Sequence, residues 1–366
     1  MKPAAWFDLP LRHRAWRPRP MRWVMQDLAG VARQPEQAHR THLRATLEWL
    51  CRAQDASRAM PGSVAGGWTF EAGWLPGSTE ASGWLIETFV PAAEYLAWPE
   101  LTDRAHRMLD SLLAQPDTAA VGRIQGLIAG HVQLGRADSL ARALESGHLL
   151  GKESLAAPAH SAEAAHALAR LGQLVQDARW LEAARRHLEA ALAQQTPCGW
   201  FADPGAAAST AGLARTVRGV AEAAAQLEDA HALRAARRAA EAMGAHLRED
   251  GWLPGAFDDG WMPAAAHACV RGTAGMAACW LRLAQSGQGA HLRDAAWRAL
   301  AWIKRNQRTT GDDLALRDAL PSAVPIWGGP SAFSFDTLGA KYFADALMMD
   351  MVGIAIPPLA QKAEPA

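Results

Sequence analysis

The stretch Leu47-Glu-Trp-Leu-Cys-Arg-Ala-Gln54, followed by the loop Gly66-Gly67-Trp68, contains the pattern that decides the fold. A segment with helical apolar spacing ends in Gln, and a Gly-Trp loop comes after it. The same order recurs at three further places, which are Leu192-Ala-Gln-Gln195 with Gly199-Trp200, His246-Leu247 with Gly251-Trp252, and Leu300–Gln307 with Trp327. The chain is therefore predicted to consist of repeated helical units.

A second helix, rich in Ala and Gly, is expected after each loop. Six such helices are predicted to begin near Ser78, Val121, Ala159, Ser209, His267 and Ser334. Their low charge is typical of helices buried on all sides, whereas the Arg and Glu stripes of the preceding helices are typical of outer helices. Neither end of the chain has a polar capping repeat, which favours a ring over an open solenoid. The sequence thus predicts an all-α fold, a closed (α/α)6 toroid of about six helical hairpins.

We expect three parts: an N-terminal basic and aromatic arm (1–40), the toroid (41–352) and a C-terminal tail (353–366). Residues 11–25 hold five arginines interleaved with Trp16, Trp23, Val24 and Met25. Such a segment suits contact with an anionic membrane surface or with a glycosyltransferase. The alternative is an arm that wraps the outside of the ring.

Charge and cysteine content restrict the class of protein. Lys and Arg number 37, equal to Asp and Glu, so the basic surplus that nucleic acid binding needs is missing and no nucleic acid partner is expected. The four cysteines form no CxxC pair, and we expect reduced thiols in a cytoplasmic protein, with a peripheral position at the inner membrane as a further option. No motif indicates a metal or another cofactor, so none is expected.

The recurring motif of a Gln at a helix end followed by a Gly-Trp loop resembles the repeats of terpenoid cyclases and protein prenyltransferases and, more loosely, of six-hairpin glycosidases. The chain more closely resembles uncharacterised toroid proteins of bacterial exopolysaccharide and capsule gene clusters. The matching stretches are Gly73–Phe89, Arg215–Gly219, Asp250–Gly255, Pro325–Gly328 and Ala340–Leu347. The resemblance implies a toroid that handles a glycan.

Three residues are candidates for catalysis. Glu80 and Glu87 are seven positions apart, so they share a helix face, and two carboxylates in one cavity suit glycosidic acid–base chemistry. His267, four residues before Arg271, is the third candidate. The structural alternatives are a helix cap near Ser78 for Glu80 and an ion pair with an arginine for Glu87.

Further residues are candidates for substrate binding. Arg215 and Arg218 stand in an Ala-rich helix, where they either meet an anionic ligand or pair with Glu80 and Glu87 across the ring. Indole rings either stack on sugars or pack in the core. The complete set of binding candidates is Trp68, Trp74, Trp84, Arg215, Arg218, Trp252, Asp258, Trp261 and Arg271.

We expect a glycan-handling protein of exopolysaccharide or other cell-surface polysaccharide biosynthesis, whose ligand is a glycan or glycolipid. As an enzyme it would be a hydrolase, lyase or epimerase on an acidic or lipid-linked glycan, but whether it is an enzyme stays open. The alternatives are a noncatalytic scaffold that binds a glycosyltransferase or a glycan intermediate, and an isoprenoid-handling toroid. The lining of the central cavity separates these alternatives.

Overall fold

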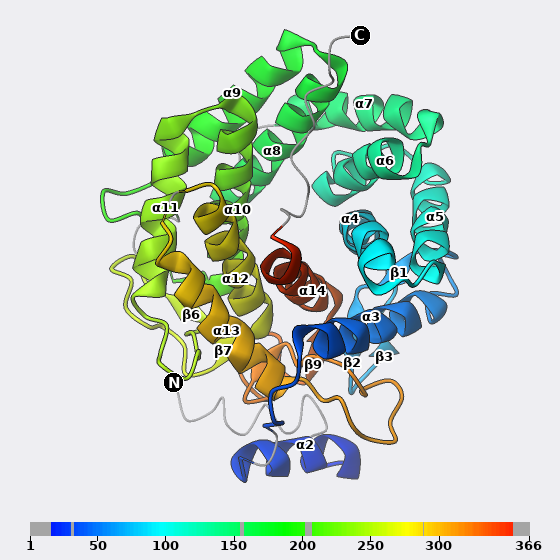
Figure 1. The fold of residues 1–366 in the computed structure, drawn as a ribbon, viewed down its shortest axis with the longest axis vertical. Coiled ribbons are helices and arrows are strands. Elements are labelled where there is room, and N and C mark those ends of the chain that lie inside the picture. The colour runs from blue at the N-terminus through cyan, green and yellow to red at the C-terminus, as the bar shows by residue number, and fades with distance from the viewer. Residues whose placement is uncertain (1–15, 31–32, 154–156, 202–206, 288, 354–366) are drawn as a thin grey trace.

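The computed structural model describes residues 16–30, 33–153, 157–201, 207–287 and 289–353. Two concentric rings of helices run through this part of the chain (Figure 1). The inner helices are α4 (Thr79–Leu96), α6 (Val121–Leu134), α8 (Pro158–Val175), α10 (Thr210–Leu227), α12 (Val270–Gln285) and α14 (Thr337–Val352). The outer helices are α3 (His39–Asp55), α5 (Glu100–Leu113), α7 (Ala137–Gly151), α9 (Ala178–Leu192), α11 (Ala230–Gly244) and α13 (Leu292–Asn306).

The ring is closed. Each inner helix contacts the next one around the ring, and α14 contacts α4. The last inner helix, α14, also packs against the first outer helix, α3, so the two ends of the domain complete the circle. The predicted all-α toroid of six helical hairpins is confirmed.

Small residues let the inner helices approach closely. A side chain at Gly83 of α4 would meet the carbonyl oxygen of Gly122, and a side chain at Gly126 would meet Gly83 in return. Gly219 of α10 lies in the same way against α8, and Gly272 of α12 lies against α10. Close approach of helix backbones requires such positions because any larger side chain would fill the space between the axes.

Short strands join the loops that precede the inner helices. They are β1 (Val64–Ala65) with β4 (Gly77–Ser78), β5 (Ala208–Ser209) with β6 (Ala256–Phe257), β7 (Ala268–Cys269) with β8 (Ala323–Val324), and β2 (Gly67–Thr69) between β3 (Gly73–Trp74) and β9 (Ser334–Asp336). All pairs are antiparallel, and Trp68 of β2 faces Phe335 of β9. Because β2 and β9 come from opposite ends of the domain, this pairing closes the loop layer as the helices close the ring.

The inner helices begin within three residues of the predicted positions. Ser78, Ser209 and Asp336 are N-caps whose side chains accept backbone N–H groups of the first turn. The largest differences are at α12, which begins at Val270 and not at His267, and at α14, which begins at Thr337. In both cases a short strand occupies the residues before the helix.

The described part of the N-terminal arm includes the helix α2 (Pro18–Leu28), which lies outside the ring (Figure 1). Pro18 occupies the first position of α2, where its missing backbone N–H costs no hydrogen bond, because N–H groups of the first turn have no partner within the helix. Trp23 anchors the helix, because it is buried against Phe335 and the guanidinium of Arg308 lies 4.1 Å from its ring. Residues 11–15 of the predicted contact segment and 354–366 of the tail lie outside the described residues.

No helix among the described residues is both long enough and apolar enough to cross a membrane.

The substitution Gly83→Ala should lower the free energy of unfolding by about 3 kcal/mol. The added methyl carbon would lie 1.8 Å from the Gly122 carbonyl oxygen, so α4 and α6 must separate. Gly151→Ala is the matched control, since nothing lies within 4 Å of its added carbon. Urea denaturation checks both variants, and equal midpoints for the two would contradict close packing of α4 on α6.

Candidate functional site

The N-termini of the inner helices converge at one mouth of the ring, where a set of polar side chains meets. We call this set the mouth cluster. It comprises Glu80 and Trp84 of α4, Glu163 of α8, Arg215 and Arg218 of α10, Arg271 of α12, Tyr342 of α14, and Asp336, which directly precedes α14. Helix N-termini carry a partial positive charge, so this mouth favours anionic groups.

Glu80 is fixed by two hydrogen bonds. The indole N–H of Trp84 donates to Oε1 over 3.0 Å, and the backbone N–H of Gly122 donates to Oε2 over 2.9 Å. The second bond caps α6, whose own N-cap residue, Ala120, has no side chain able to do so. Burial raises the pKa of the Glu80 carboxyl above its ordinary value, and the nearby Glu163 carboxylate raises it further against the two hydrogen bonds.

Glu163 is almost completely buried between two arginines. Arg215 donates hydrogen bonds to both of its carboxylate oxygens in a bidentate pair, with Nε 3.0 Å from Oε1. Arg218 approaches Oε1 to 4.0 Å, which is beyond hydrogen-bond distance. The arginines were expected to meet a ligand or to pair with Glu80 and Glu87, and the structure shows Glu163 of the adjacent helix as the partner instead.

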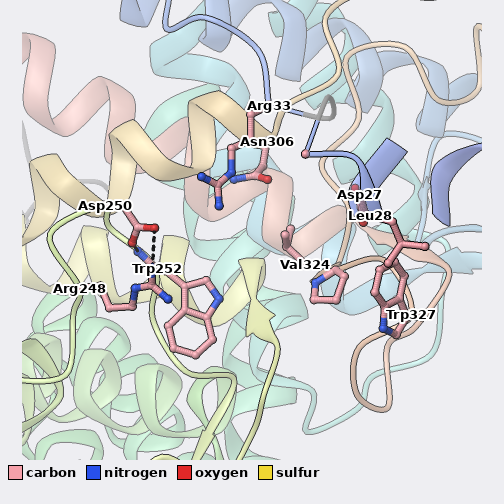
Figure 2. A pocket seen from close by; sticks show the side chains of 11 residues that line it. Asp27, Leu28, Arg33, Arg248, Asp250, Trp252, Asn306, Val324 and Trp327 are labelled. Atoms are coloured by element: carbon pink, nitrogen blue, oxygen red, sulfur yellow. Dashed lines mark hydrogen bonds and ion pairs between the residues drawn. The ribbon is translucent and has the colours of Figure 1, made fainter. Parts of the chain in front are cut away.

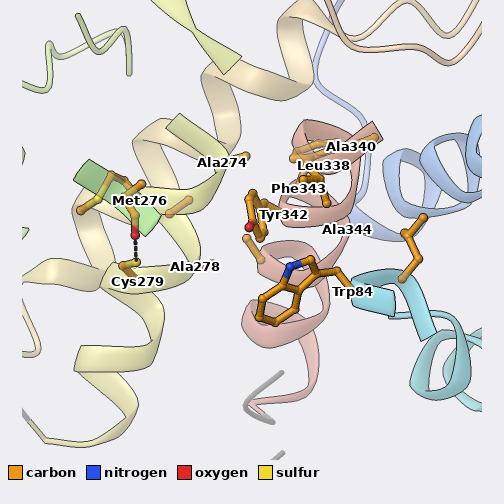
Figure 3. Close-up of a cluster of buried hydrophobic side chains, with 14 of the residues drawn as sticks. Trp84, Ala274, Met276, Ala278, Cys279, Leu338, Ala340, Tyr342, Phe343 and Ala344 are labelled. Atoms are coloured by element: carbon orange, nitrogen blue, oxygen red, sulfur yellow. Dashed lines mark hydrogen bonds between the residues drawn. The ribbon is translucent and has the colours of Figure 1, made fainter. Parts of the chain in front are cut away.

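Arg218 lies between aromatic rings. Its guanidinium carbon is 4.5 Å from the ring of Trp84 and 4.7 Å from the ring of Tyr342. Figure 3 shows these two side chains, from α4 and α14, directed into the same space inside the ring. Cation–π contacts of this kind hold a desolvated guanidinium without using its N–H groups.

Arg271 completes the cluster on the opposite side. Nη1 lies 3.5 Å from Oδ2 of Asp336, and Tyr342, Arg215 and Glu163 are all within electrostatic range. Asp336 itself is committed to the N-cap of α14 through bonds from two backbone N–H groups. About a quarter of each side chain in this pair stays exposed, so the mouth gives access to it.

Below the mouth the ring is filled by buried ion pairs. Glu87 is fully buried and pairs with Arg170, which also donates to Gln125. A further pair joins Glu222 to Arg282, and Lys341 pairs with Asp345 while its ammonium nitrogen lies 5.3 Å from the ring of Trp84. Seven residues along a helix correspond to about 10 Å, so Glu87 lies well below Glu80. The expectation that these two carboxylates look into one cavity is therefore corrected.

His267 lies outside the cluster and outside α12, because α12 starts three residues later. Its side chain lies against Gly328 and Gly329: a methyl group would come within 2.3 Å of Cβ of His267 at Gly328 and within 2.2 Å of its Nε2 at Gly329. Burial lowers the pKa of His267 below its ordinary value. The predicted pairing of His267 with Arg271 on one helix is wrong, and His267 supports a loop.

Most of the predicted stacking tryptophans pack in the loop layer. Trp68 is 3% exposed and contacts Phe70 and Phe335. Trp74 lies against Trp49, and Trp261 is buried against Trp200 and Phe257. Their role in the described structure is packing, the structural alternative considered for each of them.

Two further predicted binding residues lie at the rim. Asp258 accepts the backbone N–H groups of Gly260 and Met262 and thereby closes a turn. Trp252 is half-buried and lines a pocket together with Trp327, as Figure 2 shows. Neither residue belongs to the mouth cluster.

Glu163, Tyr342 and the buried ion pairs were not among the site residues predicted from the sequence. One signal was available: charged residues such as Arg170, Glu222 and Arg282 stand in helices otherwise made of Ala, Gly and Leu. A buried charge needs a partner, so each of them indicated another charged residue across a helix contact. No group of three His, Cys, Asp or Glu side chains suited to a metal ion occurs among the described residues.

Comparison with known proteins gives fold relatives. No family model and no curated protein sequence matches the chain. Solved structures do match, among them the unsaturated glucuronyl hydrolase of Bacillus sp. GL1, responsible for the degradation of glycosaminoglycan, with TM-score 0.71, 15% identity, and 86% of this chain and 97% of the other covered. An unsaturated glucuronyl hydrolase specific for heparin matches with TM-score 0.70, 13% identity, and coverage of 87% and 98%.

A variant of the Streptococcus agalactiae enzyme in complex with dGlcA-GalNAc6S also matches, with TM-score 0.65, 14% identity, and coverage of 84% and 89%. At these identities the likeness establishes the fold alone. It confirms the resemblance to six-hairpin glycosidases at that level, while the resemblance to proteins of exopolysaccharide gene clusters stays a prediction.

The raised pKa of Glu80 predicts that the free energy of unfolding depends on pH. The folded state binds this proton more tightly than the unfolded state, so Glu80 lowers stability as pH rises from the ordinary carboxyl value to the folded one. Glu80→Gln removes that loss and should gain stability relative to the native protein over this window. Urea denaturation across pH 4.5 to 7.5, with the exposed Glu71→Gln as control, measures it. A stability difference that does not change with pH would contradict the assignment.

Proposed function

We propose that the mouth cluster binds an acidic saccharide and that Glu80 acts as the proton donor in hydrolysis of its glycosidic bond. One observation carries the binding: Nη2 of Arg218 and Nε of Arg271 are both buried, and neither has a hydrogen-bond partner among the described residues. A buried charged donor without an acceptor is costly. A carboxylate or sulfate bound at the mouth supplies the missing acceptors.

The carboxyl groups of the cluster have different environments. Burial keeps the proton on Glu80 at higher pH than for an exposed carboxyl, which suits a general acid. Glu163, enclosed by Arg215 and Arg218, provides a fixed negative charge close to it. A pair of carboxyl groups, one of them acting as the proton donor, is the arrangement that glycoside hydrolysis uses.

The fold neighbours support an acidic saccharide as the ligand class. Their names describe unsaturated glucuronyl hydrolases, and one complex holds dGlcA-GalNAc6S. The arginine donors without acceptors and the helix N-termini of this mouth fit a ligand that carries such acidic groups. The fold relation supports a hydrolase more than a lyase or an epimerase.

The remaining alternatives separate on physical grounds. An isoprenoid chain offers no acceptor to the buried donors of Arg218 and Arg271, which disfavours the isoprenoid-handling toroid. A noncatalytic scaffold shares the binding but not the turnover. A place in exopolysaccharide assembly, and a lipid-linked form of the glycan, belong to this proposal on the sequence resemblance alone.

The test uses unsaturated uronyl disaccharides, with binding measured by calorimetry and cleavage by loss of the ultraviolet absorbance of the unsaturated ring. Arg271→Gln should weaken binding about tenfold, since one charge-assisted contact is lost. Glu80→Gln should retain binding and lower turnover by about 100-fold or more. The exposed Arg186→Ala on α9 serves as the control.

Equal affinity of the native protein and Arg271→Gln would contradict the binding site. Binding without turnover in the native protein would contradict the hydrolase and favour the scaffold.

We propose in addition that α2 docks on an anionic membrane surface. Met21, Met25 and Leu28 are spaced along one face of α2 and are 40%, 57% and 66% exposed. Arg17 and Arg22 beside them are exposed, whereas Arg19 is paired with Asp313. An apolar stripe flanked by cations is the arrangement of an interfacial helix, with a peripheral position at the inner membrane as its consequence.

Vesicle sedimentation tests this docking. The variant Met21→Gln, Met25→Gln, Arg17→Gln, Arg22→Gln should lose binding to vesicles that contain phosphatidylglycerol, because each arginine contributes about 1 kcal/mol at such a surface. The variant Arg185→Gln, Arg186→Gln on the exposed face of α9 is the control and should bind as the native protein does. Undiminished binding by the α2 variant would refute the docking surface.

A further inference from the structure

We infer that the rim of the ring carries a second saccharide-binding site, separate from the mouth cluster. It is a pocket of about 430 Å³, which we call the rim pocket, and the residues that line it include Arg33, Arg248, Trp252, Asn306 and Trp327. Figure 2 shows these side chains around the hollow. A volume of this size accommodates one or two sugar residues.

The rim pocket is built by segments from distant parts of the chain. Arg248 and Trp252 follow α11, Asn306 ends α13, and Trp327 precedes β9. The N-terminal arm holds the Trp327 loop in place, because Oδ2 of Asp27 accepts the backbone N–H of Ile326 over 2.7 Å.

His267 supports the same loop from below through Gly328 and Gly329. The loop is therefore fixed from both sides before any ligand arrives.

The aromatic side chains of the pocket suit a pyranose ring. Trp252 and Trp327 are both half-buried, so each indole is held by packing while part of it stays accessible. Indole faces bind the C–H faces of sugars, and the largely exposed guanidinium of Arg248 can donate to sugar hydroxyl groups. The amide of Asn306 is buried and donates to the carbonyl oxygen of Trp302, so Asn306 shapes the wall of the pocket. Arg248 is itself oriented by Asp250, whose Oδ2 lies 3.1 Å from Nη2.

The charge of the pocket suits an acidic sugar. Asp27 and Asp250 line the pocket but are paired with Arg308 and Arg248. Arg33 is exposed and forms no ion pair with any carboxylate of the described residues. An arginine without a counterion among the described residues, in a pocket that two indoles also line, favours a pyranose that carries a carboxylate.

The rim pocket and the mouth cluster lie at the same end of the ring. Outer helices end and inner helices begin there. The inference goes beyond the proposed function, since binding at the rim pocket requires no turnover at Glu80.

Calorimetry with an unsaturated uronyl disaccharide, a hexasaccharide of the same glycosaminoglycan and its carboxyl-reduced form tests the inference. Trp327→Ala should weaken binding of the hexasaccharide about tenfold through loss of stacking. Arg33→Gln should weaken binding of the carboxylated hexasaccharide about tenfold and leave the reduced form unchanged. The control Trp297→Ala removes an exposed indole on α13 and should change neither.

Equal hexasaccharide affinity for the native protein and for both Arg33→Gln and Trp327→Ala would overturn the rim pocket. Arg33 is exposed and forms no ion pair with a described carboxylate, so its substitution leaves the protein folded. A loss of affinity in this variant therefore reports on ligand binding. Loss of binding in these variants, in a protein that cleaves no saccharide, would support the rim pocket while the proposed hydrolase fails.

Discussion

The close approach of the inner helices is the constraint on which the rest of the structure depends. Gly83, Gly122 and Gly126 leave no space for a side chain between α4 and α6, and Gly219 does the same between α10 and α8. Because the backbones approach so closely, long polar side chains of the inner helices reach one another inside the ring. Most of these ion pairs join neighbouring helices, and the pair of Arg170 with Glu87 reaches past one intervening helix.

The interior of the ring combines an apolar wall with a charged centre. Buried ion pairs contribute little net stability, but removal of one partner is costly, so they help to fix how the helices are rotated against one another. Glu222–Arg282 joins the neighbouring helices α10 and α12, whereas Glu87–Arg170 joins α4 to α8 past α6, and each of these side chains is at most 10% exposed. At the mouth the pairing of charged groups is not complete, because Arg218 and Arg271 each keep a buried N–H donor without an acceptor among the described residues.

The ring and the helix starts were predictable because their signals are local. Gly-Trp loops and capping residues such as Ser209 mark each inner helix in the sequence itself. The partner of Arg215 was not predictable, because it depends on the rotation of α8 against α10 and not on either sequence alone. The tryptophans show the same limit: the motif places Trp261 in a loop, but only the fold shows that Trp200 and Phe257 bury it.

The most direct test of the mouth cluster as a ligand site is a carbon-13 NMR titration of the Glu80 carboxyl, with and without dGlcA-GalNAc6S. The account predicts a pKa above the ordinary carboxyl value in the free protein, because burial and Glu163 both raise it. It also predicts that this pKa changes when the saccharide binds beside it. A Glu80 signal that titrates at the ordinary value and does not respond to the saccharide would contradict the account.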